Sequence, residues 1–124
     1  MTVAKHGQME CVLLLLNAGI CVALERGQLT INEAEQILYS PAMMKTLESL
    51  GVSSELVGLI HEGTELEDVE SLAPETLFKH LASIKERALG RISALRPYDF
   101  TEGKWLVEVL RDRLSPATSG TPSE

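Results

Sequence analysis

Aromatic residues are scarce in this sequence, at only 4% of its 124 residues. Strands favour aromatic and β-branched side chains, so this scarcity disfavours a β-sandwich or a barrel. Apolar residues still make up 44% of the chain. At this length that is enough to bury one core without metals or disulfides. The composition therefore predicts a single domain rich in helix.

Positive charge is also scarce, because 11 lysines and arginines face 18 aspartates and glutamates, for a net charge of −7. This balance disfavours non-specific binding to nucleic acids and to anionic membrane surfaces. It favours a soluble protein and, if the protein has a partner, a basic one. The charge is uneven, since residues 48–75 contain eight carboxylates and no lysine or arginine.

Only two cysteines are present, Cys11 and Cys21. Ten residues of helix would separate them by roughly 15 Å along the axis. A disulfide needs Cα atoms within about 7 Å, so these two thiols cannot pair with each other. We expect both to be small core residues in a reducing cytoplasm.

The longest apolar run, Cys11 to Leu24, is interrupted by Asn17 and Gly19 and is shorter than the roughly 20 residues of a membrane span. The residues before the run do not form the basic region of a signal peptide, and the residues after it do not form a typical cleavage site. The run predicts a buried helix near the centre of the fold. The alternative is a β-hairpin that pairs residues 12–16 with 20–24, although four consecutive leucines show no alternation.

Capping signals divide the rest of the chain into helices. Thr30 and Glu33 form a capping box, Ser40-Pro41 begins a helix and Gly51 ends one. We predict an all-α fold, a compact bundle of five to six helices in antiparallel or orthogonal pairs. Residues 1–7 are expected to form a flexible leader, 8–114 the helical domain and 115–124 a disordered tail.

The segment HEGTELEDVESLAP, residues 61–74, is the part of the sequence that most resembles a metal or acid–base site. His61 and Glu65 are spaced like two ligands of a helical zinc signature, but the second histidine is replaced by glutamate. We expect Gly63 to end one helix and Thr64 with Glu67 to form a capping box that begins the next. On that interpretation the helix breaks before the carboxylates, and no metal is bound.

The sequence contains none of the common catalytic signatures: no Gly-x-Ser-x-Gly, no phosphate-binding glycine loop and no dinucleotide motif. The cysteines lie in apolar surroundings, which dull a thiol. His61 and His80 could form a scattered metal site only if distant segments meet. Arg87 and Arg91 share a helix face, but no aromatic residue lies between them to stack on bases. We predict no enzyme activity, no cofactor and no bound metal.

Several segments are similar to a small bacterial family of unknown function. They are GICVALERG at residues 19–27, Glu33-Ala34-Glu35, Tyr39-Ser40-Pro41 and LIHEGTELEDV at residues 59–69. The resemblance spans roughly residues 12–95, and its most specific part is Gly-Thr-Glu-Leu-Glu-Asp. It implies a bacterial cytoplasmic protein and carries over no catalytic residue.

We predict a non-enzymatic protein–protein interaction module whose acidic surface meets a protein partner, with a basic surface as the best match. The partner-binding residues are expected to be Glu62, Glu65, Glu67, Asp68 and Glu70. The alternatives are a toxin-neutralising protein of the immunity type and a helical domain that binds a metal or small ligand. Trp105 is expected to anchor the last helix to the core. A homodimer is expected if the first helix or the helix of Trp105 leaves apolar surface uncovered.

Overall fold

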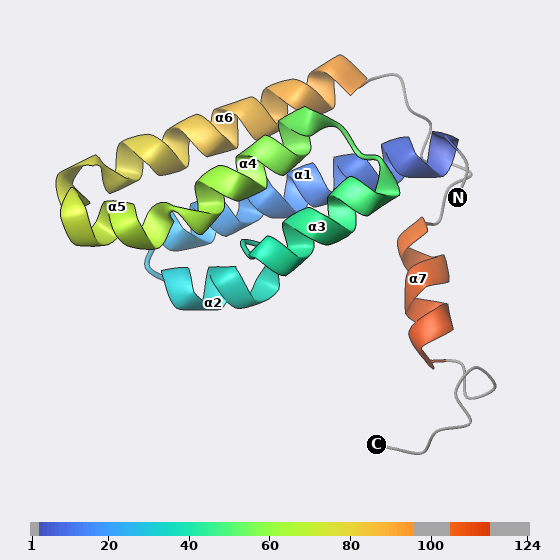
Figure 1. The fold of residues 1–124 in the computed structure, drawn as a ribbon, viewed down its shortest axis with the longest axis horizontal. Coiled ribbons are helices and arrows are strands. Elements are labelled where there is room, and N and C mark those ends of the chain that lie inside the picture. The colour runs from blue at the N-terminus through green and yellow to red at the C-terminus, as the bar shows by residue number, and fades with distance from the viewer. Residues whose placement is uncertain (1–2, 96–104, 115–124) are drawn as a thin grey trace.

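Two long antiparallel helices organise the fold (Figure 1). The computed structural model describes residues 3–95 and 105–114. α1 (Val3–Glu25) packs along α6 (Leu77–Leu95), and α4 (Ser54–Thr64) contacts both. The described residues form helices and turns only, which confirms the predicted all-α bundle.

The connection from α1 to α2 (Ile31–Ile37) follows the predicted local signals. Gly27 takes a positive φ of 69°, which glycine adopts without steric cost. The Thr30 hydroxyl then accepts a hydrogen bond from the amide of Glu33 at 3.1 Å, and the Glu33 carboxylate accepts one from the amide of Thr30 at 2.9 Å. This confirms the predicted capping box.

The middle of the chain forms α3 (Pro41–Leu50), α4, α5 (Leu66–Leu72) and a 3₁₀ turn, η1 (Pro74–Thr76). Ser40 caps α3 through the amide of Met43, and Ser53 caps α4 through the amide of Leu56. Gly51 ends α3 with a φ of 78°. Both ends of α3 lie where the capping signals predicted them, because each depends on residues within one helical turn.

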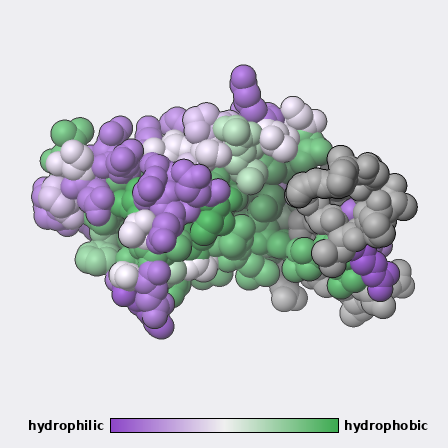
Figure 2. Space-filling view, turned by 90° about the horizontal axis from the view of Figure 1, so that it is seen from below, coloured by the Kyte–Doolittle hydropathy of each residue, from purple (hydrophilic) through white to green (hydrophobic). Residues whose placement is uncertain are grey.

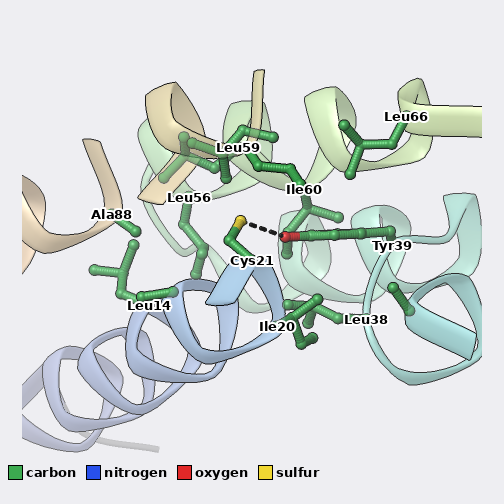
Figure 3. Packing of buried hydrophobic residues seen from close by; sticks show 14 of the residues in the cluster. Leu14, Ile20, Cys21, Leu38, Tyr39, Leu56, Leu59, Ile60, Leu66 and Ala88 are labelled. Carbon is green, nitrogen blue, oxygen red and sulfur yellow. Dashed lines mark hydrogen bonds between the residues drawn. The ribbon is translucent and has the colours of Figure 1, made fainter. Parts of the chain in front are cut away.

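The core lies between α1, α4 and α6 and is closed at one end by α2 and α5 (Figure 3). Leu14 and Cys21 of α1 face Leu56 and Ile60 of α4, and all four side chains are buried. Ala88 of α6 is also fully buried, which allows α6 to approach α1 closely. Transfer of these side chains out of water is the main term that holds the helices together.

α1 departs from prediction at its start. It is a continuous helix from Val3 through Asn17 and Gly19, so the β-hairpin alternative is wrong. It also begins well before Gln8, so residues 3–7 of the expected leader are helical. Met9 is buried, so packing supports the first turns of the helix where sequence signals are weak. The expected tail, residues 115–124, lies outside the described residues.

Several large apolar side chains of the bundle are exposed. Leu72 of α5 is 83% exposed and Phe78 of α6 is 60% exposed. α1 is not enclosed either, since Leu15 and Leu16 are exposed. The last helix, α7 (Trp105–Leu114), forms as expected and contacts α1. The side chain of Trp105, expected in the core, lies outside the described residues.

Candidate functional site

The acidic segment forms α5 at one end of the bundle (Figure 1). Leu66 is buried and fixes α5 to the core, while Val69 is half-buried. The remaining positions of the helix point outward because they are charged or polar, apart from Leu72. Carboxylates in the first turn of α5 also suit the partial positive charge at a helix N-terminus.

The predicted helix break at Gly63 is wrong. α4 continues through Gly63 to Thr64, and the chain turns at Glu65 instead. Gly63 is buried, and a Cβ atom at this position would overlap the ring of Tyr39. Glycine is therefore required here to make room for a side chain from another segment, and not to stop the helix.

The predicted capping box of Thr64 and Glu67 is also wrong. The Thr64 hydroxyl donates to the carbonyl of His61 at 2.5 Å, and α5 begins after Glu65, which provides no side-chain cap. His61 and Glu65 are thus separated by one turn of nearly continuous helical backbone. A break in the helix therefore cannot be the reason to reject a metal site on this segment.

The positions of the two histidines decide whether they could act together as ligands. His61 lies in the last turn of α4, His80 lies on α6, and both are exposed. Both lie near enough to Glu62 to help lower its pKa. Yet in the part of the chain that the structure describes, no three His, Cys, Asp or Glu side chains are grouped so that they could hold a metal ion.

Glu62 differs from the other four predicted partner-binding residues because an arginine already holds it. The guanidinium of Arg87 donates two hydrogen bonds to its carboxylate, at 2.6 and 2.5 Å. These hydrogen bonds hold the pKa of Glu62 below its usual value, against the opposing effect of burial. Arg91 likewise lies 3.8 Å from Glu55, so the two arginines predicted to share a face of α6 both pair with carboxylates of α4.

Glu65, Glu67, Asp68 and Glu70 are exposed. None of the ion pairs found among residues 3–95 and 105–114 involves them. Glu67 and Glu70, three residues apart, lie on one side of α5, while Glu65 and Asp68 line a shallow hollow with His80. The acidic surface is therefore divided between two faces of one short helix.

Glu67 and Glu70 border a cleft of about 460 Å³ between α5, the start of α6 and the α1–α2 turn. Its apolar lining comes from leucines of three segments, Leu24, Leu29, Leu77 and Leu81, together with Ile31. Thr30 and Asn32 contribute polar groups. We call this hollow the acidic cleft.

The carboxylate of Glu35, on α2, reports the electrostatic field beside α5. Burial, and after it the negative charges of Glu67 and Asp68, raise its pKa above the usual value. A raised carboxyl pKa means that another negative charge is disfavoured here. The same field would favour a bound positive charge.

A buried polar cluster, which the sequence did not predict, links α1 to the connection between α2 and α3. The Tyr39 hydroxyl donates to Oδ1 of Asn17 at 2.5 Å and lies 3.6 Å from the sulfur of Cys21 (Figure 3). Cys11 and Cys21 are both buried thiols, as predicted. Burial raises the pKa of the Cys21 thiol, the direction opposite to that which activates a nucleophile.

A second unpredicted cluster centres on Glu10 of α1, which is 6% exposed. Its carboxylate accepts hydrogen bonds from the amide and hydroxyl of Ser53 and from Nε of Arg91 at 3.2 Å. It therefore joins α1 to the cap of α4 and to α6. The one available signal was a carboxylate directly before a long apolar run.

Comparison with known proteins places the chain in a family. No curated protein and no solved structure matched the sequence. A family model, described as a protein of unknown function (DUF3969), matches residues 4–107, which is most of the chain and includes α1 to α6. The chain therefore belongs to the DUF3969 family of proteins of unknown function.

Proposed function

We propose that this protein is a non-enzymatic interaction module, and that its acidic cleft holds a lysine or arginine side chain of a protein partner. The observation that carries the proposal is the pair Glu67 and Glu70 beside an apolar lining, with no ion pair to either carboxylate among the described residues. Glu62, which Arg87 already holds, contributes less than we expected from sequence.

The lining of the cleft favours a long basic side chain over a free ion. Leu24, Leu29 and Leu77 offer apolar surface to methylene groups, while the two glutamates lie at the border. Lysine and arginine bury their aliphatic stems in this way and keep the charged end beside polar groups. A hydrated cation would gain nothing from the leucines.

Exposed apolar residues around α5 favour a protein partner over an isolated amino acid. Leu72 and Phe78 lie on α5 and on the start of α6, and both are largely exposed. Large apolar side chains that become buried at an interface contribute much of its binding free energy. A segment with a basic residue beside apolar ones would match the charge of the cleft and the apolar surface of these two residues.

Peptide display tests the proposal, because it selects binding sequences from a random library and needs no identified partner. Peptides are selected on the immobilised full chain, and the affinity of the enriched ones is measured by calorimetry against wild type and the double variant Glu67→Lys/Glu70→Lys. The matched control is Glu48→Lys/Glu86→Lys, which changes net charge equally at two exposed positions on α3 and α6.

We expect enriched peptides to contain lysine or arginine next to apolar residues. Reversal of both cleft charges replaces two attractions of about 0.5–1 kcal/mol each by repulsions, which should weaken binding by more than about tenfold. The control should change affinity less, and added salt should weaken binding. Selection of peptides without basic residues, or equal losses in the two double variants, would contradict the proposal.

A further inference from the structure

One face of α1 is apolar and uncovered. Leu15 is 55% exposed and Leu16 39%, and Gly19 lies exposed between them and the next turn. Residues 11–24 contain no charged side chain. Figure 2, which views the bundle from below, shows apolar surface along the middle of the molecule. A neutral apolar helix face fits another apolar surface and offers nothing to pair with a charged one.

Nothing among residues 3–95 and 105–114 explains a glycine at position 19. It lies inside α1, where glycine destabilises a helix relative to alanine, and it does not have a positive φ. A Cβ atom added at this position would meet nothing within 4 Å. The buried glycine of α4, Gly63, makes room for Tyr39. By the same reasoning, Gly19 would make room for a helix from outside the chain.

α7 is a helix of matching character. Leu106, Val107 and Leu110 are each about half exposed, although α7 contacts α1. Its ten residues extend about 15 Å, close to the length of the α1 face from Val12 to Val22. The chain thus carries both an uncovered apolar helix face and an apolar helix of the right length to cover it.

We propose that a second copy of this chain covers α1, with α7 of each copy packed across the other copy's α1 at Gly19. A two-fold arrangement of this kind buries both apolar surfaces of both chains at once. One helix stripe alone would fall well short of the roughly 800 Å² per partner of a stable interface, whereas each copy here contributes two surfaces. α5, with its three carboxylates, lies at the opposite end of the bundle from α7 (Figure 1).

The mass of the full chain in solution, measured by light scattering and sedimentation, tests the dimer. Gly19→Arg should give a monomer, because the added side chain blocks the crossing while open space in the single chain leaves the fold intact. Gly90→Arg is the matched control: it is also an exposed mid-helix glycine with nothing within 4 Å, and it should remain a dimer. Circular dichroism checks that both variants fold.

A mixing experiment tests the exchange of α7. Leu106→Glu/Leu110→Glu should also be monomeric, because it places two charges on the apolar face of α7 and leaves α1 unchanged. When this variant is mixed with Gly19→Arg, one α7–α1 contact of the two is intact, so a heterodimer weaker than the wild-type dimer should form.

Three results would overturn the proposal. The first is a wild-type chain that is strictly monomeric, and the second is a dimer unaffected by Gly19→Arg. The third is a mixture in which no heterodimer forms, which would mean that α7 of one copy does not pack on α1 of the other. A monomeric wild type that binds lipid vesicles through Leu15 and Gly19 would assign this face to a membrane, since α1 is long and apolar enough to span one although 56% of that segment is buried in the bundle.

Discussion

Removal of the Tyr39 hydroxyl would test how much the buried contact between Asn17 and Tyr39 stabilises the fold. Tyr39→Phe keeps the ring that packs on Gly63 and deletes only the group that donates to Asn17 Oδ1. Asn17 is completely buried, and its Nδ2 atom already lacks a hydrogen-bond partner among the described residues. The variant would therefore remove the hydrogen bond to Asn17 Oδ1 as well, in a buried region that water does not reach.

The expected loss follows from the cost of an unsatisfied buried polar group. Such a group costs about 1–3 kcal/mol, whereas a hydrogen bond at the surface exchanges with water at little cost. Asn17→Leu should also be destabilising, because it leaves the Tyr39 hydroxyl with only the weakly polar sulfur of Cys21. The double variant removes both polar groups, so it should cost less than the sum of the two single changes.

Urea unfolding followed by circular dichroism measures these free energies, with all variants at one protein concentration. Thr46→Val is the control, since it deletes an exposed hydroxyl that bonds the carbonyl of Ala42 and should change stability by no more than about 0.5 kcal/mol. If Tyr39→Phe left the midpoint unchanged, or if the single losses simply added, the hydroxyl would not be the partner on which Asn17 depends.

Two further predictions use the same unfolding assay. Gly63→Ala should destabilise the chain by about 1–3 kcal/mol, because the new methyl group overlaps the ring of Tyr39, whereas Gly90→Ala, which has open space, should stabilise it by about 0.5–1 kcal/mol; equal effects would refute the close contact. Arg87→Gln should cost less than about 1 kcal/mol at neutral pH, since the pair with Glu62 is partly exposed. Because the pKa of Glu62 is lowered from 4.5, this stabilisation exists above that value and disappears as pH falls through the lowered pKa, so the two proteins should become equally stable in acid; a difference that persists there would contradict the ion-pair explanation.

Features set by near neighbours in the chain were predictable. The capping box at Thr30, the cap at Ser40 and the left-handed glycine at Gly51 each depend on residues within one turn, and all three appear where expected. The prediction of a helix end at Gly63 was wrong for the opposite reason. Its local sequence resembles a helix end, but the ring that requires it belongs to Tyr39, and only the packing of α4 on the α2–α3 connection brings them together.

The candidate site likewise has features that the sequence predicts and features that it does not. That the five predicted partner-binding carboxylates would lie at the surface follows from their chemistry. Which of them would be neutralised does not, because Arg87 reaches Glu62 across the contact between α6 and α4. The acidic cleft is also assembled from separate segments, with Leu24 before the first turn and Leu77 at the start of α6. No spacing in the sequence indicates that these residues meet.

The position of Glu10 has a consequence for how the chain is made. Its partners lie 43 and 81 residues further along, on the cap of α4 and on α6. During synthesis the first helix leaves the ribosome long before Arg91 has been added to the chain. The Glu10 carboxylate and the apolar residues that follow it therefore stay exposed to water until α6 has been made. Contacts of such long range slow folding, and an exposed apolar segment is a target for chaperones and a start for aggregation. Fragments that stop before α6 should therefore fail to fold, however strongly their separate helices are encoded.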